Sequence, residues 1–123
     1  MMAAPPLYQV KAEFFRLLGH PVRIRVLELL RDGPRPVRDL LDDLQIEPSA
    51  MSQQLAVLRR SGIVVSYRDG PLTLYQLAGT DVADLLAAAR RILTELLSDR
   101  DHLLDQLRQA DHQTATTSMA RTA

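Results

Sequence analysis

The amino-acid sequence predicts a mostly helical fold that carries one small β-hairpin, and three observations predict it. Between residues 7 and 61, apolar residues recur every three or four positions, the spacing of buried helix faces. After Gly62 the spacing falls to about two on both sides of a turn signal, as in a hairpin. From about Thr80 the helical spacing returns and continues to Leu107, which predicts a long last helix.

Composition limits the classes of protein to consider. A chain of 123 residues is one domain's worth, and 46% apolar with 24% charged residues is typical of a globular protein. The absence of Cys excludes disulfides, zinc–thiolate sites and cysteine nucleophiles. No apolar run approaches the roughly 20 residues of a membrane span and no signal peptide is recognisable, so we expect no membrane partner and a cytoplasmic location. No catalytic motif can be assembled, so we expect no enzyme.

Charge is unevenly distributed although the net charge is zero. Six arginines and two acids lie between Arg16 and Arg38, whereas residues 39–47 hold four acids and no base. A neutral chain with this pattern can present only a modest basic face, so binding to nucleic acid phosphates would need two copies of the chain.

The first two helices are bounded by Pro and Gly signals. The first begins at Leu7, after an expected disordered segment 1–6, and stops at Gly19. Two adjacent residues of this helix, Phe14 and Phe15, cannot both face one small core, so we expect one of them to contact a partner chain. The second helix opens at His20-Pro21 and ends at Asp32-Gly33-Pro34.

The next two helices form a helix-turn-helix pattern. A short helix from about Pro36 to Leu44 is followed, after Gln45-Ile46, by a helix from Pro48 to the stop at Gly62. That last helix has an apolar stripe and an opposite face of short or flexible hydrogen-bonding side chains. The stripe is Met51, Leu55 and Leu58, and the opposite face is Ser49, Ser52, Gln53 and Arg60. A helix in a DNA major groove requires such a pair of faces, although an ordinary amphipathic helix has them as well.

A hairpin, or wing, follows the helix-turn-helix. Residues 63–67 and 72–77 are β-branched, aromatic or leucine-rich, and Arg68-Asp69-Gly70-Pro71 between them is a turn signal with Asp-Gly at its centre. An isolated hairpin is marginally stable in water, so we expect this one to pack on the helices.

The last helix is longer than one small domain can cover. Thr80 is its expected N-cap, and its apolar positions alternate in steps of four and three. They are Val82, Leu86, Ala89, Leu93, Leu96, Leu103 and Leu107. We therefore expect part of this seam to pair with a second subunit. The predicted folded domain is 7–109, and 110–123 is expected to be a disordered tail.

Three segments in this order resemble the ArsR/SmtB family of bacterial winged-helix transcriptional repressors. The segments are His20–Leu30, Met51–Val64, and the wing with Arg68-Asp69-Gly70 and Leu74-Tyr75-Gln76-Leu77. The resemblance implies a winged helix-turn-helix of order α-α-α-α-β-β-α that dimerises through its terminal helices. It further implies a homodimeric regulator, expected to be a repressor, on an imperfect palindrome in double-stranded DNA, with helix 48–60 in the major groove and wing 63–77 on the backbone or minor groove.

The resemblance also implies site residues. Those expected at DNA are Ser49, Ala50, Ser52, Gln53, Gln54, Arg59, Arg60, Tyr67 and Arg68. Those expected at the dimer interface are Leu7, Tyr8, Phe14, Phe15, Leu86, Ala89, Leu93 and Leu96. Gln53 is the best candidate for reading adenine, whereas Gln54 is a candidate for base or phosphate.

The usual metal ligands of the family are missing from this sequence. Where the family's thiolate site needs Cys, the chain has Val37-Arg38-Asp39. For the site between last helices it offers only Asp81 and Glu95, with Ile92 in place of a His. We expect no metal and no cofactor, and an unidentified small molecule or protein as effector if one exists.

Two alternatives remain open at this point. One is a metal-responsive repressor that uses a C-terminal cluster of Asp99, His102, Asp105 and His112. The other is a winged-helix protein–protein adaptor whose Ser/Gln face contacts protein instead of DNA.

Overall fold

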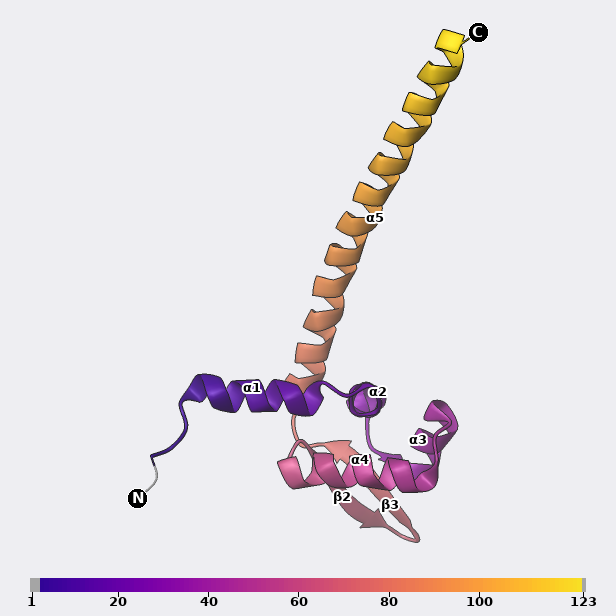
Figure 1. Ribbon diagram of the computed structural model, residues 1–123. Helices are drawn as coiled ribbons and strands as arrows, with labels where there is room; N and C mark the ends of the chain where they lie inside the picture. The colour runs from indigo at the N-terminus through magenta and orange to yellow at the C-terminus, as the bar shows by residue number, and fades with distance from the viewer. Residues whose placement is uncertain (1–2, 123) are drawn as a thin grey trace. The chain divides into compact units, whose positions relative to one another are not determined.

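The computed structural model describes the backbone of residues 3–122 and the side chains of residues 3–110. The elements in order are α1 (Leu7–Leu18), α2 (Pro21–Leu29), the 3-10 turn η1 (Leu30–Asp32), β1 (Arg35–Pro36), α3 (Val37–Leu44), α4 (Pro48–Ser61), β2 (Val64–Asp69), β3 (Leu72–Leu77) and α5 (Asp81–Thr122) (Figure 1). The chain divides into two compact units, one ending at Leu86 and the other beginning at Ala87.

The predicted element order is confirmed, a mostly helical winged helix-turn-helix with a small antiparallel sheet. The disorder expected for 1–6 and 110–123, and the domain bounds 7–109, stay predictions. Residues 1, 2 and 123, and the side chains from residue 111 onward, lie outside the described part of the chain.

Local chemistry fixes the ends of the helices as expected. The His20 Nδ1 accepts a hydrogen bond from the Val22 backbone N–H at 3.1 Å and so caps α2, with Pro21 at its first position. Gly62 ends α4 with φ +85°, and its N–H donates to the Arg59 carbonyl at 3.0 Å. That left-handed conformation is costly for a residue with a Cβ, which explains a glycine there.

The sheet has three strands, in the order β1-β3-β2, where the sequence predicted only a hairpin. Strands β2 and β3 pair from Val64↔Leu77 to Asp69↔Leu72, so the two connecting residues are Gly70-Pro71, and not Asp69-Gly70 as the turn signal suggested. A positive φ of 61° at Gly70 supplies what the first central position of a tight hairpin turn needs.

The short strand β1 was missed because two residues carry no periodicity. Arg35 pairs with Tyr75 and Pro36 with Leu74, on the side of β3 away from β2. Pro lacks a backbone donor and is tolerated only on such an edge strand. The strand ties the segment before α3 to the wing, so the wing is joined to the helices through the backbone as well as through side chains.

One apolar core lies within the first unit. Its fully or nearly buried members are Leu18, Val26, Leu27, Leu29, Leu30, Leu40, Met51, Leu55, Leu58 and Val64. None of the buried side chains among the described residues is polar or charged. The predicted stripe on α4 is confirmed, because all three of its residues are at most 2% exposed. Packing of this stripe against α2, α3 and β2 positions the opposite face of α4 toward solvent.

The two phenylalanines of α1 have different environments, as expected. Phe14 packs against the core, whereas Phe15 is 55% exposed and contacts Phe14 edge to face at 5.7 Å between ring centroids. No described helix is both long and apolar enough to cross a membrane.

Candidate nucleic-acid interface

A tight turn orients the two helices of the helix-turn-helix. Gln45 ends α3 in the left-handed region with φ +53°, and its N–H donates to the Leu41 carbonyl at 2.9 Å. Its side-chain Nε2 donates to the Asp42 carbonyl at 2.7 Å. These two bonds satisfy carbonyls at the end of α3 and offset the strain of a positive φ at a non-glycine residue.

The front of α4, the face opposite its buried stripe, is exposed to solvent. Ser49, Ser52, Gln53, Arg59 and Arg60 are exposed, whereas Ala50 is half-buried at the flank. Within the described part of the chain, no hydrogen bond or ion pair engages the side chains of the five exposed residues. Hydroxyl, amide and guanidinium groups that can donate or accept hydrogen bonds are therefore exposed along α4, from Ser49 to Arg60.

Gln54 differs from its neighbour Gln53. It lies on the partly buried side of α4, where its Oε1 accepts a hydrogen bond from the Arg23 Nε at 2.8 Å. Arg23 in turn donates from Nη1 to the Leu17 carbonyl at 2.9 Å. The Arg23 side chain therefore connects α2 to α4 and to the end of α1. Contact of Gln54 with DNA stays a prediction.

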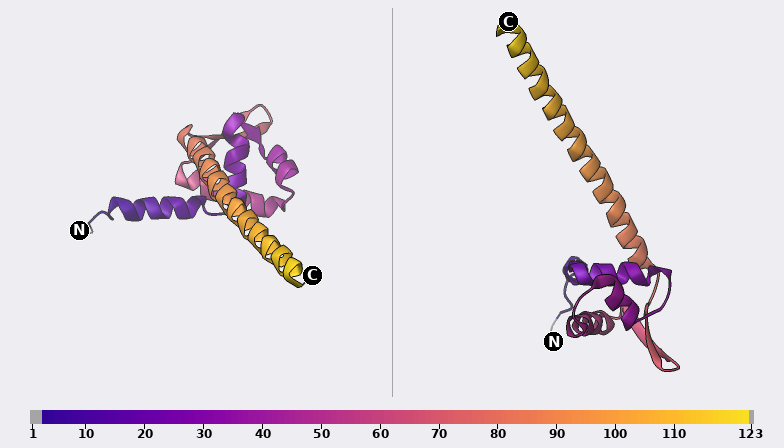
Figure 2. Two further views of the ribbon diagram at one scale, coloured as in Figure 1. Left: turned by 90° about the horizontal axis from the view of Figure 1, so that it is seen from above. Right: turned by 90° about the vertical axis from the view of Figure 1, so that its right-hand side faces the viewer.

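The wing carries the other predicted contacts near its turn. Tyr67 is 41% exposed and pairs with Leu74 across the hairpin, and the exposed Arg68 pairs with Thr73. The end of the hairpin extends beyond the helices of the first unit in Figure 1 and in the right-hand view of Figure 2. Both side chains therefore lie exposed near the end of the hairpin, and their contact with DNA stays a prediction.

An open groove between the wing and the helix-turn-helix includes residues that the sequence analysis did not single out. Its volume is about 350 Å³, and Arg38, Ser52, Thr73 and Tyr75 are among its lining residues. The Arg38 side chain is 70% exposed and 4.0 Å from its sequence neighbour Asp39, a weak pairing. The signal for Arg38 in the sequence was a single basic residue in the first turn of α3. Only the position of β3 in the structure shows that this residue faces the wing.

The residues predicted at a dimer interface are apolar, and many of them are exposed. On α1, Leu7, Tyr8 and Phe15 are each more than half exposed. On α5, Leu93 and Leu96 are 55% and 59% exposed, whereas Leu86 and Ala89 are half-buried. Further along α5, Leu103 and Leu107 continue the exposed seam. Such large apolar surfaces on a single chain indicate contact with another molecule.

The described acidic and histidine residues near the end of α5 do not gather into a metal site. The described part of the chain contains no group of three or more His, Asp or Glu side chains placed to hold a metal ion. His102 contacts Gln106 through its Nε2 at 3.1 Å, and Asp105 lies 3.9 Å from Arg108. The side chain of His112 lies outside the described residues.

Comparison with known proteins identifies the family. A family model described as "Bacterial regulatory protein, arsR family" matches residues 20–66. The "Uncharacterized HTH-type transcriptional regulator Rv0081" of Mycobacterium tuberculosis is 52% identical over 108 residues, 87% of this chain and 95% of the relative. The "HTH-type transcriptional repressor SmtB" of M. tuberculosis is 35% identical over 89 residues, 71% of this chain and 66% of the relative.

Solved structures agree with this relationship. The crystal structure of Rv0081 matches with a TM-score of 0.72 and 53% identity, covering 79% of this chain and 98% of that one. A solution structure of the homodimeric winged helix-turn-helix DNA-binding domain Mb0332 from Mycobacterium bovis matches with a TM-score of 0.63 and 28% identity, covering 76% and 92% of the two chains. The chain therefore belongs to the ArsR family of bacterial regulatory proteins, which are helix-turn-helix transcriptional regulators.

Proposed function

We propose that this ArsR-family regulator is a repressor that binds double-stranded DNA as a homodimer, with α4 in the major groove. The observation that carries the proposal is the division of α4 into a fully buried back and a front of unengaged polar and cationic side chains. The family and the relatives are transcriptional regulators and not enzymes, and several relatives are repressors.

Base recognition is assigned to the front of α4 near its N-terminal half. Gln53 presents an amide that can bond both N6 and N7 of adenine, a pairing worth about 1–3 kcal/mol of discrimination. Ser49, Ala50 and Ser52 flank it, and their short side chains allow the helix to approach base edges and thymine methyl groups closely. The operator is thus expected to include an adenine in each half-site.

Phosphate contacts are assigned to the end of α4 and to the wing. Arg59 and Arg60 lie in the last turn of α4, and Tyr67 and Arg68 lie near the hairpin turn. No carboxylate among the described residues pairs with these three arginines, so their charge is available for phosphates. They position the protein on the duplex without reading sequence, and the wing contacts the backbone or the minor groove.

The homodimer uses the exposed apolar faces of α1 and α5. Mb0332 is a homodimeric relative, and the faces described above are too large for a monomer to leave in water. Two copies double a phosphate-binding charge that is modest in one neutral chain. A two-fold symmetric dimer requires an imperfect palindrome with half-sites about one helical turn apart, or a multiple of it.

The signal that releases DNA is proposed to be non-metallic, a small molecule or a partner protein. The usual family ligand positions hold no His or Cys, since Val37, Arg38 and Asp39 occupy one site and Ile92 part of the other. The metal-responsive alternative depends on the cluster near the end of α5, and the test below includes it.

The proposal is tested by selecting binding sites from random duplex DNA and from the promoter region of the gene itself. Binding of the full chain to the selected site is then measured by fluorescence anisotropy across a salt series, with and without Zn²⁺. We expect specific binding that weakens steeply with salt, because phosphates release counterions, and that zinc leaves unchanged. Failure to select any duplex would overturn the proposal in favour of the protein–protein adaptor, and release by zinc would favour the metal-responsive alternative.

A further inference from the structure

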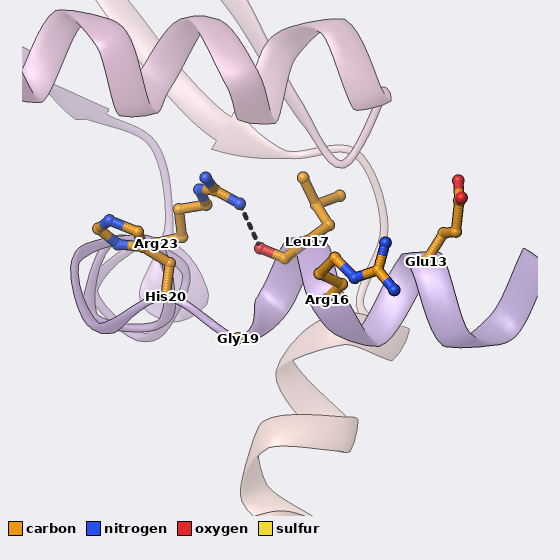
Figure 3. Close-up of a pocket in the computed structure, with 6 residues that line it drawn as sticks. All are labelled: Glu13, Arg16, Leu17, Gly19, His20 and Arg23. Carbon is orange, nitrogen blue, oxygen red and sulfur yellow. Dashed lines mark hydrogen bonds between the residues drawn. The ribbon is translucent and has the colours of Figure 1, made fainter.

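An open pocket lies at the junction of α1 and α2, away from the front of α4. Its volume is about 400 Å³, and it is lined by Glu13, Arg16, Leu17, Gly19, His20 and Arg23. Figure 3 shows Arg23 and His20 at one end, Glu13 at the other, and Arg16 between them. The lining therefore contains two guanidinium groups and one carboxylate, and the carboxylate is at the far end from Arg23.

The charge of Arg23 has no anionic partner. Its side chain is half-buried, and only neutral oxygens accept from it, the Gln54 Oε1 and the Leu17 carbonyl. No carboxylate among the described residues lies within ion-pair distance of Arg23 or of Arg16. Two of the five guanidinium donors of Arg23 are used, so three remain for a ligand.

His20 adds a further donor. Because its Nδ1 accepts the Val22 N–H, the neutral ring carries its proton on Nε2. A partly buried guanidinium without an anionic partner, in a pocket that an imidazole N–H and a second guanidinium also line, is an environment that favours a negatively charged oxygen group.

We propose that this pocket binds a small oxyanion, a carboxylate or a phosphate, and that the bound anion weakens the hold of Arg23 on the recognition helix α4. A full negative charge attracts the guanidinium more strongly than the dipoles of an amide or a carbonyl. The guanidinium is rigid and planar, so turning its three free donors toward the anion moves its Nε away from the Gln54 Oε1, and α4 loses a tether to α2 and to the end of α1. Anion binding thus lowers operator affinity, because DNA binding needs α4 held in one position. The effect on DNA rests on the proposed function, whereas anion binding itself does not.

The first experiment measures anion binding to the ¹⁵N-labelled full chain without DNA. Sodium phosphate is titrated against sodium chloride at constant ionic strength while NMR follows the side-chain amide of Gln54 and the backbone amides of Gly19 and Val22. We expect saturable shifts at these groups. Arg16→Gln should weaken phosphate binding about tenfold, the loss of one hydrogen bond to a charged group. The Arg16 side chain makes no hydrogen bond or ion pair with any other described residue, so we expect Arg16→Gln to fold normally.

Arg31→Gln is the matched control, because it removes one exposed, unpaired arginine outside the pocket. It should leave phosphate affinity unchanged. Shifts that do not saturate, or that are equal in the wild type and in Arg16→Gln, would overturn the anion site whether or not the protein binds DNA.

The second experiment separates a free anion from a DNA phosphate, since both offer the same chemistry. Operator affinity is measured with phosphate replacing chloride at constant ionic strength. We expect at least a fivefold loss for the wild type and for Arg31→Gln, and a much smaller loss for Arg16→Gln at the same phosphate concentration. If Arg16→Gln already binds the operator more weakly without phosphate, the pocket holds a DNA phosphate and the free-anion proposal is wrong. Unchanged wild-type affinity would overturn the coupling to α4.

Discussion

Two adjacent glutamines on α4 have different environments because a helix turns by about 100° at each residue. Gln53 is exposed and unengaged, whereas Gln54 accepts a hydrogen bond from Arg23, 31 positions earlier in the chain. The amphipathic pattern predicted the first side chain as part of a binding face. A bond between residues so distant in sequence leaves no local signal, so the second role emerged only from the structure.

Gln53→Ala should reduce affinity for the selected operator by about 10- to 100-fold, corresponding to one lost bidentate base contact. Binding to unrelated duplex should stay the same, because phosphate contacts remain. Gln106→Ala, an exposed glutamine of α5, is the matched control. Equal losses on operator and unrelated DNA would show that Gln53 does not read bases.

Gly62→Ala should destabilise the protein by about 1–2 kcal/mol, because a Cβ is disfavoured at φ +85°. Apart from Gly62 and its neighbours in the chain, no atom lies within 4 Å of the position that the Cβ would take, so the cost comes from the local backbone conformation and not from a clash with the rest of the protein. Urea unfolding at fixed protein concentration measures it. Gly79→Ala, equally open and without a positive φ, should change stability much less. Similar losses in both variants would contradict this explanation of the α4 stop.

At the scale of elements, strong periodicity was a reliable guide and short segments were not. Helix α4 has a buried stripe within its 14 residues, and the hairpin strands are runs of six residues each, mostly β-branched, aromatic or leucine. Both patterns are long enough to reveal the type of element. Strand β1 has only two residues, one of them Pro36. It forms because both residues pair with β3, and not because of its own sequence. The left-handed conformation of Gln45 was likewise not predictable, because no glycine marks the position. The Gln45 side chain stabilises the turn instead.

The back of α4 should be far more sensitive to volume than to chemistry. Met51 is fully buried, so Met51→Ala should cost about 2–5 kcal/mol of unfolding free energy through lost burial and a cavity. Met51→Leu conserves volume and should cost less than about 1.5 kcal/mol. Both are measured by urea unfolding at one protein concentration. Comparable costs for the two variants would mean that the site is not packed as described.

At the scale of the whole molecule, we propose that function requires two chains. The sequence predicted this from the apolar seam of α5 and from Phe14 and Phe15, and the exposure of Leu93, Leu96 and Phe15 agrees with it. The pocket at the α1–α2 junction was not predictable, because its residues form no motif in the sequence. Only the structure shows that they line one pocket and that the charge of Arg23 has no anionic partner.

Leu93→Glu should raise the dimer dissociation constant by at least about thirtyfold, since a central apolar anchor is typically worth about 2 kcal/mol or more. Sedimentation equilibrium measures the change. Arg91→Glu is the control, because a position two residues away lies on the opposite side of the helix. An unchanged dissociation constant for Leu93→Glu would place the dimer interface elsewhere.

We propose that two chains place two α4 helices in successive major grooves of one operator. The most direct test of this arrangement is the stoichiometry of the full chain on the selected duplex, combined with a hydroxyl-radical footprint of both strands. We predict two chains per duplex and two protected half-sites, centred about 34–36 Å or a multiple of that distance apart. One chain per duplex, or a single protected segment without symmetry, would contradict this arrangement.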